Sequence, residues 1–278
     1  MPAIEPGGRV RVSVKRALAR LPEVSGSRGA TLLIYHRVGG GTLDELDLGS
    51  ADFVRQLDLL AAHDVVSLDE ALNRLDAGDE RPTIVLTFDD GFSDVFQNAW
   101  PHLLERGLPF IIYLASGYVG RTMVWEGSTA RGTAGSGLSW DQLAELLASG
   151  LATIGNHTHT HLRPEVLGVG DVDDCSDAIE QALGVRPAHF TYPWGVPVPG
   201  IEAELRSRFR SASTGDLGRN LADADRWRLR RVPVRRTDPL AFFEAKLTGN
   251  LRAEHAYARL VSTAKVARRV MPKVGRAR

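Results

Sequence analysis

The chain alternates short apolar runs with longer amphipathic segments. Continuous apolar and β-branched residues predict buried strands, whereas an apolar period near 3.6 predicts helices. Strands are expected at residues 30–35, 65–66, 83–88, 110–114, 153–154, 189–192 and 227–234. Helices are expected at residues 53–62, 67–75, 93–104 and 140–149, with a last helical region from Asp238-Pro239. Strands that alternate with helices predict parallel βαβ units, and therefore an α/β fold.

Two of these helices carry a capping box at their start, in Ser67 with Glu70 and in Ser139 with Gln142. The strand at residues 83–88 ends differently, in a pair of carboxylates. Asp89 and Asp90 follow it directly and precede a glycine. Because side chains alternate along a strand, the two carboxylates should leave its end in different directions. One could ligate a metal ion while the other works as a base.

A histidine cluster occupies residues 157–161. On a helical turn, His157 and His161 would share one face, which suits two imidazoles that bind one ion. His159 would lie on another face, where a solvated or supporting role is favoured. One carboxylate with two imidazoles leaves positions open for water, as in catalytic rather than structural metal sites. These residues predict a metal-dependent hydrolase.

The order of these motifs resembles that of the polysaccharide deacetylase family, the NodB-type family 4 carbohydrate esterases. The matching segments are Tyr35-His36-Arg37-Val38, Thr87-Phe88-Asp89-Asp90-Gly91, Leu138-Ser139-Trp140, the run from His157 to His161, and Tyr192-Pro193-Trp194-Gly195. They fall between about residues 32 and 234, which is most of the chain. The resemblance implies a distorted (β/α) barrel of about seven strands, with the chemistry at the carboxyl ends of the strands.

By the same resemblance, Asp90, His157 and His161 would hold the metal and Asp89 would be the general base. The ion would polarise an acetyl carbonyl and acidify a water, while the carboxylate removes the proton. Zinc is the default expectation for this ligand set, and cobalt, nickel or iron would also suit it. The implied substrate is an acetylated carbohydrate.

One family feature, an arginine that orients the catalytic carboxylate, is missing from its usual place. Thr191 stands there instead. Candidate replacements are Arg37, Arg163 and Arg231.

A second feature, the histidine that protonates the leaving group in the fifth motif, is also missing. The corresponding segment is Arg231-Val232-Pro233-Val234. An amide nitrogen cannot leave as an anion, so another acid is required. The candidates are His36, whose motif the family places at the rim of the active site, His189, and Asp89 once it is protonated.

Three aromatic residues are candidates for sugar binding. Trp125 falls in a long loop at residues 120–137, which is expected to lie over the site. Tyr192 and Trp194 could line a groove, and backbone N–H groups around them could serve an oxyanion. The equal alternatives are that Trp125 only anchors its loop and that the other two rings pack in the core.

Composition and charge narrow the function classes. The chain is 43% apolar with a formal net charge of zero, which is typical of globular proteins and argues against a general nucleic-acid binder. Both ends are basic, and a helix near residues 10–21 could contact an anionic membrane or, as we favour, pack on the protein. We expect a basic leader or amphipathic helix at 1–29, a catalytic domain at 30–247 and a basic helical extension at 248–278.

No apolar run approaches the ~20 residues that span a bilayer, and the N-terminus lacks the apolar core of a signal peptide. We therefore expect a cytoplasmic protein, at most peripheral to the inner membrane face. Cys175 is the only cysteine in the sequence, so no intrachain disulfide can form.

The favoured function is removal of acetyl groups, N-acetyl ahead of O-acetyl, from a sugar in a polysaccharide or glycan precursor. Two alternatives stay open. One is an O-acetyl esterase acting on a glycan or small molecule. The other is an inactive, metal-containing glycan-binding domain, which the missing arginine and histidine would explain.

Overall fold

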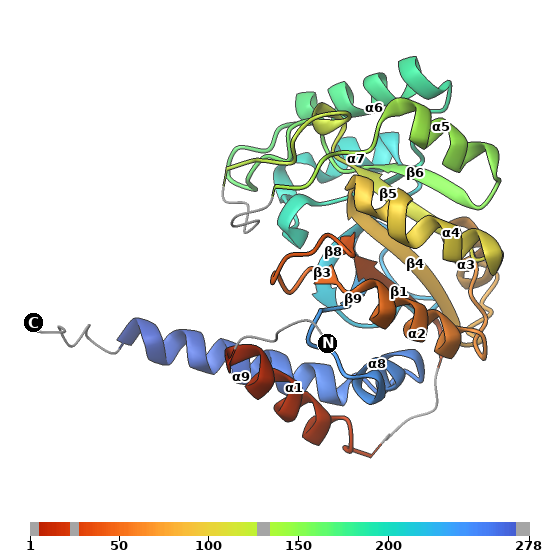
Figure 1. Ribbon diagram of the computed structural model, residues 1–278. Helices are drawn as coiled ribbons and strands as arrows, with labels where there is room; N and C mark the ends of the chain where they lie inside the picture. The colour runs from red at the N-terminus through yellow and green to blue at the C-terminus, as the bar shows by residue number, and fades with distance from the viewer. Residues whose placement is uncertain (1–5, 23–27, 127–133, 271–278) are drawn as a thin grey trace, which may run out of the picture. The chain divides into compact units, whose positions relative to one another are not determined.

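The computed structural model describes residues 6–22, 28–126 and 134–270 (Figure 1). Contacts divide the chain into two compact units, residues 27–236 and a terminal unit that combines residues 1–26 with 237–278. Residues 237–247 thus group with the chain ends, and the expected domain boundaries stay a prediction. Among the described residues, no helix has the length and apolar content needed to cross a bilayer.

Residues 27–236 form a closed barrel of seven parallel strands in the order β1-β4-β5-β6-β7-β8-β9. The strands are β1 (Ala30–Tyr35), β4 (Thr83–Asp90), β5 (Phe110–Leu114), β6 (Ala152–Asn156), β7 (His189–Thr191), β8 (Ser211–Leu217) and β9 (Leu229–Pro233). The last strand pairs with the first, at Leu33 and Val232, which closes the barrel. The predicted (β/α) barrel of about seven strands is confirmed.

Helices follow most strands and cover the barrel (Figure 1). They are α2 (Ser50–Leu60), α3 (Leu68–Asp76), α4 (Trp100–Glu105), α5 (Trp140–Ala148), α6 (Val169–Leu183) and α7 (Glu202–Arg208). The side chains of Ser67 and Ser139 cap α3 and α5, and the full capping box forms at Ser139 with Gln142 but not at Ser67, where the Glu70 carboxylate binds Arg74. The helix expected over residues 93–104 instead begins as a π-helical segment, Val95–Ala99, before α4. A small sheet pairs β2 (Arg37–Val38) with β3 (Asp47–Leu48).

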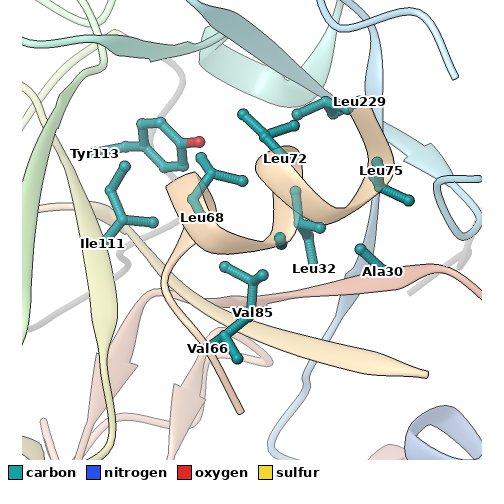
Figure 2. Close-up of a cluster of buried hydrophobic side chains, with 11 residues drawn as sticks. Ala30, Leu32, Val66, Leu68, Leu72, Leu75, Val85, Ile111, Tyr113 and Leu229 are labelled. Carbon is teal, nitrogen blue, oxygen red and sulfur yellow. The ribbon is translucent and has the colours of Figure 1, made fainter. Parts of the chain in front are cut away.

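Helix α3 packs its leucines against several strands of the barrel (Figure 2). The cluster joins this helix to side chains of β1, β4, β5 and β9. Its members include Leu68, Leu72 and Leu75 of the helix and Leu32, Val85, Ile111 and Leu229 of the strands. Since α3 directly precedes β4, this packing fills the barrel toward the amino ends of the strands. The carboxyl ends, where the motif residues lie, remain for the site.

The terminal unit consists of α1 (Pro6–Leu18), α8 (Leu240–Leu247) and α9 (Arg252–Val270). Val14 and Leu18 pack against a cluster that contains Phe242 and Tyr257, so the amphipathic segment near residues 10–21 packs on other helices of the protein. This is the alternative favoured from the sequence.

A buried group of charges also joins the three helices. Lys15 and Lys246 both bind Asp238, over 2.7 and 2.6 Å, and Lys246 lies 3.0 Å from Glu254. The last helical region is expected from Asp238-Pro239, but α8 begins at Leu240 with Pro239 as its N-cap, so Asp238 lies outside the helix. Its carboxylate is instead used by the two lysines.

Candidate active site

The register of the barrel brings the acidic pair and the histidines to one rim. Asp90 pairs with Leu114 of β5, and Leu114 pairs with Asn156 of β6. Asp90 and Asn156 therefore end their strands at the same level, two strands apart. His157 follows Asn156 directly, so it reaches the same rim as the acidic pair.

Asp90, His157 and His161 form a group that could hold a metal ion. The Oδ1 atom of Asp90 lies 3.2 Å from Nε2 of His157 and 3.4 Å from Nε2 of His161. All three side chains are buried, and their ligand atoms lie within 4.8 Å of one another. One carboxylate oxygen and two imidazole nitrogens thus converge on a single point.

The loop that carries the histidines is not the helical turn that the spacing suggested. Residues 157–161 are irregular, and Thr158 and His161 have positive φ values of 66° and 53°. Asp90 and Trp194 also have positive φ, at 74° and 63°. These four are the non-glycine residues with positive φ in the described part of the chain, and all lie in or beside this group. Such concentrated backbone strain is typical of functional sites.

Several hydrogen bonds hold this strained loop. The side chain of Asn156 accepts from the Thr158 N–H over 2.8 Å, and Thr158 Oγ1 accepts from the His161 N–H over 3.1 Å. The Asn156 amide in turn donates to the Val172 carbonyl of α6. Asn156 was not among the site residues expected from the sequence. Its position directly before the first histidine was the one available signal.

The orientation of His157 fits metal binding. Its Nδ1 lies 2.9 Å from the carbonyl oxygen of Thr191, to which a protonated Nδ1 donates. When the imidazole is neutral, this bond leaves Nε2, the atom that faces Asp90, unprotonated and able to ligate a metal ion. Thr191 thus contributes through its backbone at the position where the family usually has an arginine.

His159 lies outside the ligand group. Its Nδ1 lies 2.8 Å from the Ser116 hydroxyl, and its backbone N–H donates to the Asp171 carbonyl. This agrees with the supporting role that the sequence favoured.

Arg231 takes the place of the missing arginine. Its two Nη atoms donate to the two oxygens of Asp89 over 2.7 and 2.8 Å, and its Nε donates to the Thr214 carbonyl. Both side chains are almost fully buried. The other two candidates are engaged elsewhere. Arg37 binds Asp94, and the guanidinium of Arg163 lies 5.6 Å from the centre of the Trp194 ring.

Opposing effects set the protonation of the two aspartates. Burial raises the pKa of Asp89, but the positive charge of Arg231 outweighs this effect and holds the pKa below its usual value. Burial also raises the pKa of Asp90, whereas hydrogen bonds from His157 and His161 bring it well below its usual value. Both carboxyl groups are therefore ionised at neutral pH, as a ligand and a base require.

Of the two histidines proposed as the acid, His36 is the one that lies near the acidic pair. It follows β1 directly, and its charge contributes to lowering the pKa of both Asp89 and Asp90. Its Nδ1 is buried and has no hydrogen-bond partner among the described residues. His189 instead starts β7, where its Nδ1 lies 2.8 Å from the Ser211 hydroxyl and its Nε2 lies 3.3 Å from the carboxylate of Asp69 in α3. This position removes His189 from the candidates.

Two tryptophans flank His161, one of the three candidate metal ligands. The ring centre of Trp125 lies 4.4 Å from that of His161, and the ring centre of Trp194 lies 5.3 Å from it. Trp125 is partly exposed, and Trp194 is 39% exposed. The described part of the loop at residues 120–137 therefore reaches the site through Trp125. The remainder of that loop, residues 127–133, lies outside the described residues.

The expectation that the Tyr192 ring lines a groove is wrong. The side chain is fully buried in a core cluster with Phe190, Leu205 and Ala212. Because side chains alternate along an extended chain, Tyr192 points away from the barrel interior that Thr191 faces. The Tyr192 N–H donates to the Ser213 carbonyl, so it cannot serve an oxyanion, and the Trp194 N–H remains the candidate for that role.

Comparison with known proteins identifies this arrangement. Residues 76–207 match the family described as Polysaccharide deacetylase. No curated protein sequence gives a significant match.

Several solved structures share the fold. IcaB from Ammonifex degensii is 27% identical, with a TM-score of 0.67, and the match covers 81% of this chain and 98% of IcaB. The Streptococcus pyogenes deacetylase PplD, solved in complex with acetate, is 18% identical, with a TM-score of 0.64 and coverage of 81% and 99%. A de-N-acetylase from Aggregatibacter actinomycetemcomitans is also 18% identical, with a TM-score of 0.58 and coverage of 76% and 96%.

The sequence match covers the acidic pair and the histidine loop, and the fold match with IcaB covers 81% of the chain. The resemblance inferred from the motifs is thereby confirmed. Residues 76–207 thus resemble the polysaccharide deacetylase family in sequence, and the fold is shared with solved polysaccharide deacetylases, which together indicate a hydrolase acting on carbon–nitrogen bonds other than peptide bonds.

Proposed function

We propose that this protein is a divalent-metal-dependent deacetylase that removes N-acetyl groups from a sugar in a polysaccharide or glycan precursor. The observation that carries the proposal is the convergence of Asp90, His157 and His161 beside a second carboxylate, Asp89, that Arg231 holds in place. A ligand group next to an ionised, oriented base is the arrangement that metal-assisted hydrolysis needs.

Asp90, His157 and His161 would hold the ion. A bound divalent ion would polarise the acetyl carbonyl and lower the pKa of a water, and zinc is the metal that this ligand set favours. The donors also suit cobalt, nickel and iron. The chain's own contribution is to aim two Nε2 atoms and one carboxylate oxygen at the same point.

Asp89 would be the general base. It is ionised at neutral pH and almost fully buried, and both of its oxygens are fixed by Arg231. Because the carboxylate is already held in one orientation, little conformational entropy is lost when it accepts a proton from water, and this lowers the barrier of the reaction. Arg231 would act as a positioning residue.

His36 would supply a proton to the leaving nitrogen. The departing amine must be protonated, and His36 is the histidine outside the ligand group that lies near Asp89 and Asp90 in the described structure. Asp89, after it has taken a proton from water, is the alternative donor.

Trp125 and Trp194 would bind the sugar, because their rings flank His161 and remain partly exposed. The N-acetyl linkage is supported by the de-N-acetylase among the similar structures, and the acetyl group by the deacetylase solved with acetate.

A cytoplasmic location stays a prediction, which fractionation of cells against a cytoplasmic marker would test.

The test is acetate release from matched N-acetylated and O-acetylated sugars. Wild type is compared with Asp89→Asn and His157→Ala, each with and without added zinc or cobalt. We expect metal to restore activity to metal-stripped wild type only, with the N-acetylated sugars preferred. Undiminished acetate release by Asp89→Asn would refute the mechanism.

Preference for the O-acetylated sugars would instead identify an esterase. Retention of metal without release of acetate from any sugar would favour the glycan-binding alternative.

A further inference from the structure

The zero net charge of the chain conceals two oppositely charged units. Residues 1–26 and 237–278 hold 14 Lys and Arg against 5 Asp and Glu, a balance of +9. Residues 27–236 hold 20 against 29, a balance of −9. All four lysines of the chain lie in the terminal unit. The separation of charge follows the division of the chain into two units.

The buried side-chain charges of the terminal unit cancel one another. Lys15 and Lys246 are fully buried with Asp238 and Glu254, so two cations and two anions cancel. Among the described residues of this unit, Glu244 is the one exposed acid. The other cations whose side chains the structure describes, six arginines, are all exposed, so the excess positive charge of the described part lies on its surface.

A row of arginines runs along the exposed side of α1 and the turn that follows it. Arg9, Arg16 and Arg20 are seven and four residues apart, which places them on one helical face. All three are exposed, and none has an ion-pair partner in the part of the chain that the structure describes. Arginines of the barrel unit such as Arg55, Arg81 and Arg186 are instead paired with acids.

The arginine row leads to a hollow of about 380 Å³ within the terminal unit, beside α9. Its lining combines a cationic and an apolar part, namely Arg252, His255 and Arg259 with Leu21 and Ala256. Leu21 directly follows Arg20, so the hollow continues the row. Helices α1 and α9 lie alongside each other here (Figure 1).

Exposed aliphatic side chains accompany the arginines. Val10 is 63% exposed beside Arg9, and Leu260 is 52% exposed beside Arg259. A helical surface that presents arginines together with exposed aliphatic residues is typical of proteins that lie on anionic membranes. A binder of small soluble anions would not need the aliphatic residues.

We infer that the terminal unit docks the protein on an anionic phospholipid bilayer, with the hollow beside α9 receiving a lipid phosphate. The arginine row would follow the plane of the headgroups, and Val10 and Leu260 would enter the boundary with the acyl chains. The negative barrel unit would be repelled by the same surface. Docking would therefore occur through the terminal unit.

The test is co-sedimentation of the full chain with vesicles of phosphatidylcholine alone or with 30% phosphatidylglycerol, about the fraction that gives a strong negative surface potential. We expect binding to the anionic vesicles at low salt, little binding to the neutral ones, and loss of binding at high salt. Equal binding to both kinds of vesicle, or none to either, would overturn the proposal.

Matched charge reversals distinguish a specific role of this arginine surface from a general effect of the protein's net charge. The first variant combines Arg16→Glu, Arg20→Glu and Arg259→Glu, and the control combines Arg55→Glu, Arg81→Glu and Arg186→Glu. Each arginine near an anionic surface is worth about fivefold in affinity, so the first variant should bind at least ~100-fold more weakly while the control binds like wild type. Equal loss in both variants would show a net-charge effect only and refute the surface.

Two further measurements complete the test. Inorganic phosphate at millimolar concentration, with ionic strength held constant, should not displace the protein from the vesicles. Full displacement would identify a free-anion site instead. Acetate release from a soluble sugar should be unchanged in the first variant, so failure of docking and failure of the proposed enzymatic function remain distinguishable.

Discussion

The guanidinium of Arg231 makes two parallel hydrogen bonds to the carboxylate of Asp89, over 2.7 and 2.8 Å, across 142 residues of sequence. The pair lies inside the barrel, where β9 returns to β1 and completes the ring. The arginine that the family usually places before its Tyr-Pro motif is thus supplied from a different strand. The function of orienting the carboxylate is retained, although the residue that performs it has moved.

Substitution of Arg231 should impair catalysis and stability together. Arg231→Gln would leave Asp89 buried and unpaired, which should lower the free energy of unfolding by about 3 kcal/mol. Misorientation of the base should reduce kcat by about 100-fold, with a smaller change in KM. Steady-state kinetics and urea denaturation would measure both effects. Arg230→Gln, an exposed neighbour on the same strand, is the control, and equal kinetic losses in the two variants would contradict the assignment.

Removal of a metal ligand should be distinguishable from removal of a neighbouring histidine. We expect His161→Ala to lose bound metal and acetate release together, since one of three protein ligands is gone. His159→Ala should retain its metal, because that side chain contacts Ser116 and not the ligand group. Metal content after dialysis, measured by mass spectrometry, decides this. Loss of metal from both variants would show that the loop, and not the ligand, was disturbed.

Asn156 should affect metal binding although its side chain is not one of the candidate ligands. Its side chain accepts from the strained Thr158 N–H and donates to α6, so Asn156→Ala should release the histidine loop. Loss of such a supporting bond typically weakens metal binding by about 10- to 100-fold. Titration with zinc in competition with a chelating dye would measure the change. Wild-type zinc affinity in Asn156→Ala would rule out this role.

The aromatic residues around the site should divide into two classes. Trp125→Ala should raise KM for a sugar substrate by about fivefold, because a stacked ring of this kind contributes on the order of 1 kcal/mol. Tyr192→Phe should leave KM unchanged, because the ring is buried in the core and its hydroxyl has no hydrogen-bond partner in the described structure. Steady-state kinetics with an oligosaccharide substrate would compare the KM values of the two variants. A raised KM in Tyr192→Phe would be inconsistent with the structure.

The terminal unit should lose stability in acid through Asp238. Burial raises the pKa of this carboxyl, but Lys246 and Lys15 outweigh it and bring the pKa to about 2. Since the folded pKa lies below the unfolded one, the stabilisation is present above pH ~4 and is lost as pH falls toward 2. It amounts to something on the order of 2 kcal/mol at neutral pH.

Thermal unfolding of Asp238→Asn between pH 2.5 and 6 would test this. The variant should be less stable than wild type near pH 6, and the difference should shrink as the pH falls. Glu244→Gln, which removes an exposed acid of the same unit, is the control. A difference between wild type and Asp238→Asn that stays constant with pH would refute the assignment.

Much of the fold followed from local sequence. The apolar run at residues 83–88 and the capping residues Ser67 and Ser139 act over a few neighbouring positions, so their pattern predicted β4, α3 and α5. The acidic pair and the two histidines were also identifiable, because the chemistry requires those residue types in that order. The barrel and the family were predicted on the same basis.

The tertiary structure alone decided which side chains meet. Three arginines were equivalent in the sequence, and closure of the barrel between β9 and β1 selected Arg231. The backbone of the histidine loop depends on bonds from Asn156, so the spacing of two histidines suggested a helical turn that is not formed. Tyr192 points into the core for a related reason. Side-chain direction and long-range pairing are set by the packing of the whole barrel. A local sequence pattern contains no information about that packing.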